Sequence, residues 1–225
     1  MKPDFAGHRD QKFGYISYAQ NGDDFMIANI FMLLGIPKFN WLDLGAHHPI
    51  DISNTAHAYA RGNTGVNIEA NPNLYAEFKK ARPKDINVNI GVGLENGVKT
   101  FYMFGEVHGR NTFSLEEVGK LKTLYNYEVR KKVELPILTV NEIVQRFCNK
   151  VWPDLLLTDI EGLDFDVLAS ADFTENNKPK LIVTEIREEQ GLMTKRLLLD
   201  RGYFCYCRMN ENLFFIPTQF QRRVY

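Results

Sequence analysis

The turn that follows residues 41–44 constrains the fold of this chain more than any other feature of its sequence. Residues 41–44 form a short apolar run that includes Asp43, Gly45 follows at once, and residues 53–60 have a helical pattern. A strand, a tight glycine turn and a helix build a nucleotide pocket at the carboxyl end of the first central strand of an α/β sheet. Glycine suits such a turn because it has no Cβ to obstruct the backbone or a ligand. The later glycines of the dinucleotide fingerprint are absent from residues 49–51, so the pattern favours a ligand that needs only one glycine.

Composition limits the classes of partner. The chain has 225 residues, enough for one domain, and its net charge of −1 provides no electrostatic hold on nucleic acid or an anionic membrane. No apolar run has the length of a membrane span, and no leader opens the chain. Cys205 and Cys207 would share one face of a strand, and we interpret them as buried apolar residues in a reducing cytosol. We therefore expect one cytoplasmic domain, residues 1–225, in which residues 1–40 cap the ligand site.

Apolar runs and helical periodicities alternate along most of the chain, with a loop over residues 105–114. Continuous apolar strands that alternate with helices predict an α/β fold, in which a mainly parallel twisted sheet carries helices on both faces. The short turn between the last two strands permits an antiparallel edge. We expect strands over residues 41–44, 65–69, 85–92, 98–104, 128–135, 154–159, 180–185, 203–207 and 213–217, and helices over 25–34, 52–61, 71–82, 115–126, 139–147, 163–171 and 190–201.

Four of the expected strands end on an acidic residue: Asp43, Glu69, Asp159 and Glu185. In an open parallel sheet, ligands bind outside the carboxyl ends of the strands, so these carboxylates are candidate ligand contacts. Each could instead cap a helix or form a salt bridge. Glu69 closes the second strand, where a carboxylate accepts hydrogen bonds from two ribose hydroxyls. Asn89 could face the adenine of a nucleoside, or it could serve a turn.

Several motifs, in this order, give the chain a resemblance to a known family. The sequence from residue 14 to residue 217 resembles the FkbM-type S-adenosylmethionine-dependent methyltransferases. The resemblance implies a Rossmann-like class I methyltransferase fold and O-methyl transfer, often to a sugar hydroxyl in polysaccharide, glycolipid or natural-product biosynthesis. The motifs that carry it are residues 43–46 (Asp-Leu-Gly-Ala), 53–55 (Ser-Asn-Thr), 67–72 (Asn-Ile-Glu-Ala-Asn-Pro), 82–87 (Arg-Pro-Lys-Asp-Ile-Asn), 111–114 (Asn-Thr-Phe-Ser) and 159–164 (Asp-Ile-Glu-Gly-Leu-Asp).

The resemblance also implies a set of cofactor-binding residues. The residues for the methionine part of S-adenosylmethionine lie at the first strand and its turn. Those for the ribose lie at the end of the second strand, and those for the adenine lie late in the third. Residues 20–24 resemble the family's Gln-x-Gly-Glu-Asp, which would cover the amino-acid end of the cofactor. The implied residues are Gln20, Asp24, Asp43, Gly45, Ala46, Asn54, Glu69, Ala70, Asn89, Ile90 and Asp159.

Two positions depart from the family pattern beside the expected active site. Thr158 stands where the family commonly has Lys before its Asp-x-Glu-Gly motif, and residues 47–49 (His-His-Pro) replace the more usual Asn-x-Gly. Some branches of the family carry such a His-Pro. These departures bear on the acceptor more than on the fold.

Methyl transfer from a sulfonium is an in-line displacement, so alignment of the acceptor oxygen supplies much of the acceleration. A sugar hydroxyl is a poor nucleophile and needs a general base or a cation. Asp159 and Glu185 end neighbouring strands and could hold one divalent ion, Mg²⁺ or Mn²⁺, with the hydroxyls of the acceptor. Alternatively, His47, His48 or Asp159 takes the proton directly.

The acceptor is expected to be a small carbohydrate, and a nucleotide sugar is one form of it. His108 and Arg110 could contact its phosphate, although they could equally belong to an exposed polar loop; Asn111 and Glu161 complete the expected acceptor residues. The protein would be a monomer, or a homodimer paired through its C-terminal edge strands.

Two rival functions stay open. An NAD-dependent sugar-nucleotide oxidoreductase or epimerase fits Glu69, but it would need a fuller glycine fingerprint and a couple such as Tyr-x-x-x-Lys, which are absent. A catalytically silent nucleoside-binding protein of the same fold is favoured by Thr158.

Overall fold

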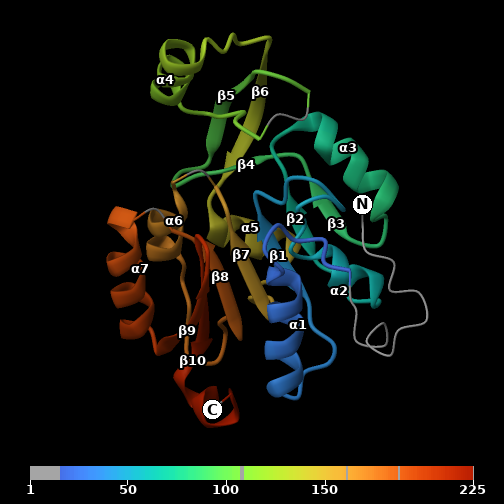
Figure 1. The fold of residues 1–225 in the computed structure, drawn as a ribbon, viewed down its shortest axis with the longest axis vertical. Coiled ribbons are helices and arrows are strands. Elements are labelled where there is room, and N and C mark those ends of the chain that lie inside the picture. Colours follow the sequence, from blue (N-terminus) through green and yellow to red (C-terminus); the bar gives the residue numbers. More distant parts are fainter. Residues whose placement is uncertain (1–15, 107–108, 161, 187, 225) are drawn as a thin grey trace, which may run out of the picture.

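The computed structural model describes residues 16–106, 109–160, 162–186 and 188–224. Within these residues the largest sheet has the strand order β3-β2-β1-β7-β8-β10-β9 (Figure 1). The strands β3, β2, β1, β7 and β8 run parallel to one another, and β10 is antiparallel to both β8 and β9. This arrangement confirms the mainly parallel sheet with an antiparallel edge. The strands are β1 (Trp41–Leu44), β2 (Val66–Ile68), β3 (Ile86–Val88), β7 (Leu155–Thr158), β8 (Leu181–Glu185), β9 (Tyr203–Met209) and β10 (Asn212–Pro217).

Helices cover both faces of this sheet, because successive side chains of its buried strands point to opposite sides. On β1, Leu42 and Leu44 pack with α5 (Val140–Phe147), α6 (Asp164–Ser170) and α7 (Glu188–Asp200). Trp41 instead packs with α1 (Asp23–Leu33) and α2 (Ala56–Ala60) on the other face. The described chain closes with η2 (Thr218–Phe220) and α8 (Gln221–Val224), and none of its helices combines the length and apolar character needed to cross a membrane.

The order of the strands reverses beside β1. The chain proceeds from β1 to β2 and β3 on one side of the sheet and later returns to place β7 and β8 on the other. In open α/β sheets the crevice at such a reversal, outside the carboxyl ends of the strands, is where ligands bind. The helix α3 (Pro72–Ala81) starts near this edge, with Asn71 as its N-cap; the Asn71 Oδ1 accepts a 3.0 Å hydrogen bond from the Asn73 N–H, as expected from the sequence.

A second, smaller sheet has the order β4-β6-β5 and extends beyond the carboxyl edge of the main sheet (Figure 1). It consists of β4 (Gly91–Val92), β5 (Gly97–Met103) and β6 (Lys131–Leu138), and α4 (Leu115–Tyr125) lies between β5 and β6 in the chain. We call residues 97–138 the arm. Phe101, Met103 and Leu135 form a small core within it.

Two of the elements that differ from the expectation do so for an identifiable physical reason. The helix expected over residues 52–61 begins only at Ala56, because Ile52 has a left-handed backbone (φ 59°) and the Ser53 Oγ accepts a hydrogen bond from the Ala56 N–H. The strand expected over 85–92 is divided into β3, which pairs with β2, and β4, which pairs with β6 of the arm. One run of alternating residues therefore serves two sheets.

The prediction that Cys205 and Cys207 share a strand face is wrong. The register between β9 and β10 shifts between Phe214 and Phe215, so that β9 carries an extra residue there. Such a bulge reverses the alternation of side chains. Cys205 consequently packs against one core cluster and Cys207 against the other.

Candidate functional site

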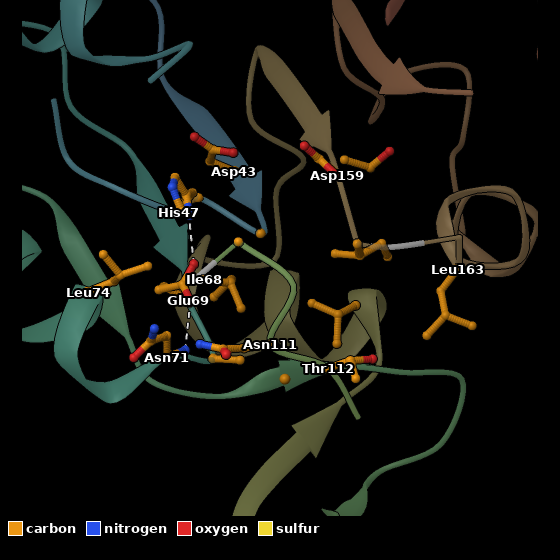
Figure 2. Close-up of a pocket in the computed structure, with 18 of the residues that line it drawn as sticks. Asp43, His47, Ile68, Glu69, Asn71, Leu74, Asn111, Thr112, Asp159 and Leu163 are labelled. Atoms are coloured by element: carbon orange, nitrogen blue, oxygen red, sulfur yellow. Dashed lines mark hydrogen bonds between the residues drawn. The ribbon is translucent and has the colours of Figure 1, made fainter. Parts of the chain in front are cut away.

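A cavity of about 650 Å³ lies at the carboxyl ends of β1, β2 and β7. This volume falls within the range of about 300–1,000 Å³ that is typical of small-molecule sites. Figure 2 shows Asp43 and Asp159 on one side of the cavity and Asn111 and Thr112, from the arm, on the opposite side. The lining therefore combines the strand ends of the main sheet with the arm.

Glu69 directly follows β2 and is held from both sides. Its Oε2 accepts a 2.8 Å hydrogen bond from the His47 N–H, and its Oε1 accepts a 2.6 Å bond from the Asn71 N–H (Figure 2). Only 8% of Glu69 is exposed, and burial raises its pKa to about 7 although both backbone bonds oppose the rise. Each carboxylate oxygen has more than one lone pair, so both can accept a further hydrogen bond from the cavity.

The structure shows why the turn after β1 requires glycine at position 45 and that the backbone of Asp159 lies against it. Gly45 has a left-handed backbone with φ 84°, and the N–H groups of Gly45 and Ala46 both donate to the Ile68 carbonyl at 3.0 Å. A Cβ on Gly45 would stand 2.0 Å from the carbonyl oxygen of Asp159. The missing side chain thus lets the ends of β1 and β7 meet at the cavity.

Asp43 lies in β1 beneath this turn and also lines the cavity. Its Oδ2 accepts a 3.2 Å hydrogen bond from the Thr55 hydroxyl. Burial raises the pKa of Asp43 to about 6, and the positive charge of Arg82 and the Thr55 bond hold it from rising further. Asp43 and Glu69 are therefore buried acids that lose their protons near neutral pH.

The two histidines after the turn have different roles. His47 lines the cavity and has a left-handed backbone (φ 55°), which is strained for a residue with a Cβ. Burial lowers its pKa, with the neighbouring His48 adding to the effect, so the ring is neutral at pH 7. His48 is not part of the lining, and its Nδ1 accepts hydrogen bonds from the N–H groups of Ile50 and Asp51, which fixes the turn.

A loop of the arm is fastened to the start of α3. The side-chain amides of Asn71 and Asn73 donate to the Glu106 carbonyl at 2.7 and 3.1 Å. Asn111 lines the cavity, but its carboxamide accepts from the Phe104 N–H and donates to the Gly105 carbonyl. Its first role in this structure is therefore to shape the loop.

The structure brings many of the expected site residues together around one cavity. Those that line it are Asp43, Gly45, Ala46, His47, Asn54, Glu69, Ala70, Ile90, Asn111 and Asp159. His108 and Glu161 lie outside the described residues. Expected residues that do not line the cavity are Gln20, Asp24, His48, Asn89, Arg110 and Glu185.

The residues outside the lining have other partners. The Asp24 carboxylate accepts from the Ser17 hydroxyl and the Tyr18 N–H, which folds the entry to α1. The Asn89 amide donates to the Glu69 and Ala70 carbonyls and joins the ends of β2 and β3. The Arg110 guanidinium lies over the Tyr125 ring. None of the described residues before Asp43 lines the cavity, and α1 packs on a face of the sheet.

Some lining residues were missed by the sequence analysis. Lys99 and Phe101 come from β5 and Phe113 from the loop before α4, so they enter the site only because the arm folds over it. Asn212 reaches the lining from the start of β10, and its amide donates to the buried Asp23 carboxylate at 3.1 Å. No local pattern marks Lys99, Phe101 or Asn212, whereas Phe113 belongs to the 111–114 motif.

The divalent ion expected at Asp159 and Glu185 finds no support in the geometry. Asp159 lines the cavity, whereas Glu185 does not. Throughout the part of the chain that the structure describes, no three His, Cys, Asp or Glu side chains converge in a way that could hold a metal ion.

Comparison with protein families identifies the chain. The family model described as the methyltransferase FkbM domain matches residues 43–205, nearly three quarters of the sequence. The chain belongs to the FkbM methyltransferase family. The match begins in β1 and ends in β9, so it includes the arm and the strands around the cavity, and it confirms the resemblance and the Rossmann-like methyltransferase fold. No curated protein and no solved structure matches the chain.

In this FkbM-family chain, Thr158 takes a defined place beside the cavity. It is buried at the end of β7, lines the cavity and donates a 2.8 Å hydrogen bond to the Thr184 hydroxyl of β8. A lysine would have to place its charged end either in that buried position or in the cavity. The departure from the family pattern therefore alters the lining and not the strand pairing.

Proposed function

We propose that this FkbM-family methyltransferase uses S-adenosylmethionine to methylate a hydroxyl group of a sugar. The acceptor is a nucleotide sugar or a precursor of a polysaccharide or glycolipid. The observation that carries the donor assignment is the Glu69 carboxylate, which faces the cavity from the end of β2 with both oxygens fixed by backbone N–H groups. A carboxylate at this place in a doubly wound sheet accepts hydrogen bonds from ribose hydroxyls.

The lining fits such a donor along its length. When bound, S-adenosylmethionine supplies a methyl group on a positively charged sulfur. Asp43 and Asp159 provide carboxylates on the strand-end side of the cavity, next to the Gly45 turn. Leu74 and Ile90 give an apolar surface near Glu69, which suits a flat adenine ring. The residues thus offer a polar side to a charged amino-acid end and an apolar side to a base.

Two side chains at the cavity can accept the proton of the acceptor hydroxyl. His47 has a neutral ring at pH 7, because burial lowers its pKa, and a neutral imidazole is a competent base. Asp159 lines the same cavity from the end of β7. The remaining task of the chain is to align the acceptor oxygen with the methyl group.

The arm supplies the chemistry expected for the acceptor. Lys99 places a cation at the lining, and Phe101 and Phe113 contribute aromatic rings whose centroids are 4.7 Å apart. A cation suits the phosphate or carboxylate of an activated or acidic sugar, and aromatic rings suit the apolar face of a sugar. This combination supports an anionic carbohydrate acceptor.

Calorimetric titration tests the donor assignment. The full chain is titrated with S-adenosylmethionine, S-adenosylhomocysteine and NAD⁺, each with and without Mg²⁺ or Mn²⁺. We expect binding of the two adenosyl sulfur compounds and no binding of NAD⁺. Binding of NAD⁺ alone would overturn the proposal and favour the oxidoreductase alternative.

Turnover is tested separately on a panel of nucleotide sugars and acidic sugars, with mass spectrometry to detect a gain of one methyl group. Transfer that persists in EDTA would show that no divalent ion is needed. Donor binding without transfer to any hydroxyl in the panel would favour the catalytically silent alternative, for which the buried Thr158 is the relevant feature.

We also propose a cytoplasmic location. The three cysteines are free thiols, which suits a reducing compartment. Monomer and homodimer are both compatible with the proposed site, because every residue assigned to it comes from one chain.

A further inference from the structure

A buried guanidinium lies behind the wall of the cavity. Arg82 follows α3 and is only 1% exposed. Its Cζ stands 5.2, 5.1 and 5.2 Å from the ring centroids of Trp41, Tyr59 and Phe78, so three rings enclose the charge. A buried cation needs partners for its donors, because leaving them unpaired is costly. The positions of those partners indicate its role.

One partner forms an ion pair, three belong to a loop, and the Arg82 Nη2 also lies at 3.4 Å from the Asn67 Oδ1 of β2. The Arg82 Nε donates to the Asp85 Oδ2 at 2.8 Å. Its Nη1 donates to the Thr55 Oγ1 at 2.9 Å and lies at 3.4 Å from the Ser53 Oγ. The same nitrogen is 3.5 Å from the Pro49 carbonyl. All three of these oxygens belong to residues 45–55, the segment that connects β1 with α2 and contributes His47, Ile52 and Asn54 to the lining.

The Thr55 hydroxyl relays this contact to the cavity. It accepts from Arg82 and donates to the Asp43 Oδ2 at 3.2 Å. A hydroxyl has one proton, so a strong donor on one side directs that proton to the acceptor on the other. Asp43 in turn lines the cavity (Figure 2), whereas Arg82 and Thr55 do not.

We propose that Arg82 is a positioning residue for the donor site, which acts through Thr55 to hold the Asp43 carboxylate and the segment 45–55 in their binding arrangement. This inference rests on the proposed function, because it assigns the arrangement to the donor S-adenosylmethionine. Asp43 is the group that touches the donor, and Arg82 sets its position and charge from behind.

The charges around Asp43 support this role. Arg82 and Asp85 face it from behind, Glu69 stands beside it after β2, and His47 and Asp159 share its cavity. Burial raises the pKa of Asp43 to about 6. Asp85 and Glu69 are further acids close to it, and Arg82 is the cation whose charge opposes this rise in pKa. The Thr55 bond also favours the ionised carboxylate. Without these two partners, Asp43 would keep its proton at higher pH and attract a cationic donor less.

A purely structural role is the rival explanation. Asp85 also accepts from the Gly65 N–H and the Asn67 amide, so the Arg82–Asp85 pair could serve only to join β2, β3 and α3. Removal of Arg82 would not separate the two roles, because a chain that leaves the buried Asp85 without its ion-pair partner can fail to fold. Thr55→Val separates them, since it removes the relay and leaves the ion pair in place.

The experiment compares the wild-type chain with Thr55→Val, Thr55→Ser and Thr194→Val. Thr194 is a buried threonine of α7 that bonds within its own helix, so it controls for the loss of a buried hydroxyl. Affinity for S-adenosylmethionine is measured by calorimetry from pH 5.5 to 8.5, together with the melting temperature. The titration of the Asp43 carboxyl is followed by carbon NMR without ligand.

We expect Thr55→Val to weaken binding at pH 6 by about tenfold, which corresponds to loss of one bond to a charged group. In Thr55→Val, the pH below which the affinity falls and the pKa of Asp43 should both move upward by about half a unit or more. Thr55→Ser should restore both, and Thr194→Val should change neither. If Thr55→Val lowers only the melting temperature, the positioning role is wrong. If the wild-type chain binds no adenosyl sulfur compound at any pH, the proposed function fails, and this inference with it.

Discussion

Glu69 and His47 are joined by a 2.8 Å hydrogen bond from the His47 N–H to the Glu69 Oε2, although twenty-two positions separate them in the chain. The bond ties the end of β2 to the loop after β1, the two segments that a nucleoside would touch in this fold. It also means that the carboxylate cannot turn away without releasing the loop. The position of Glu69 and the shape of the loop are therefore one feature.

The first prediction concerns donor affinity. Glu69→Gln keeps the size of the side chain but cannot accept from both N–H groups and both ribose hydroxyls. We expect the affinity for S-adenosylhomocysteine to fall by about 10- to 100-fold, as for hydrogen bonds to a charged group. Calorimetry measures it, with Glu77→Gln on the exposed side of α3 as the control. Unchanged affinity in Glu69→Gln would remove this residue from the proposed donor site.

The second prediction concerns the pH dependence of stability. Burial raises the pKa of Glu69 from its ordinary value of 4.5 to about 7. Between these values the folded state binds more protons than the unfolded state, so the free energy of unfolding falls as the pH rises. The contribution of the protonated Glu69 to the free energy of unfolding is fully present below pH 4.5 and is lost once the pH passes 7. Asp43, with a pKa of about 6, acts in the same direction.

Urea unfolding of the ligand-free chain at pH 5 and pH 8 measures this effect. We expect Glu69→Gln to reduce the difference between the two pH values by about 1–3 kcal/mol, since a shift of one pKa unit corresponds to about 1.4 kcal/mol. If the free energy of unfolding changes between pH 5 and pH 8 by the same amount in the wild type and in Glu69→Gln, Glu69 is not the group that binds the extra proton in the folded state.

The third prediction concerns the turn. Gly45→Ala requires a left-handed alanine and places a Cβ 2.0 Å from the Asp159 carbonyl oxygen. We expect it to lower the free energy of unfolding by about 2 kcal/mol or more, because the backbone conformation alone costs about 1–2 kcal/mol. Gly119→Ala in α4 is the matched control: a Cβ there meets no atom within 4 Å, and alanine should stabilise the helix by up to about 1 kcal/mol. Equal stabilities would contradict the close approach of β1 and β7.

The fourth prediction assigns the proton acceptor. Asparagine tolerates a left-handed backbone, so His47→Asn keeps the N–H that holds Glu69. We expect kcat to fall by about 10²-fold or more, as for loss of a general base. The donor Kd should stay within about threefold, a change below 1 kcal/mol. The comparison is Asp159→Asn: if the loss of kcat follows that variant alone, Asp159 is the base.

Much of the main sheet could be predicted from the sequence because its signals are local. A buried parallel strand such as 155–158 is a continuous apolar run, and Asn71-Pro72 is a helix start on its own chemistry. The division of residues 85–92 between two sheets was not predictable in this way. It depends on the pairing of Gly91 with Ile137, a residue far away in the chain.

The same distinction between local signals and long-range pairing applies to the candidate site. Asp43, Glu69 and Asp159 were predicted to lie together because parallel strands end at one edge of a sheet. Lys99 and Asn212 reach the cavity through the fold of the arm and through an antiparallel strand, which no local pattern specifies. Arg82 was noticed only as part of a motif, since burial of a charge behind a site cannot be inferred from spacing.

The arm contacts the rest of the molecule through the pairing of β6 with β4 at Gly91–Ile137 and Val92–Leu138, and through the Glu106 carbonyl, which accepts from the side-chain amides of Asn71 and Asn73. The strand ends of the main sheet and the arm are thus two distinct parts of the chain that line one cavity. A change in the arm side chains that line the cavity, such as Lys99 and Phe101, can alter that side of the site and leave Asp43 and Glu69 in place, as long as the contact between Glu106 and Asn71 is kept. An engineer who wishes to give this scaffold another acceptor should therefore exchange residues 97–138 as a unit and keep the Glu106 carbonyl that binds Asn71 and Asn73.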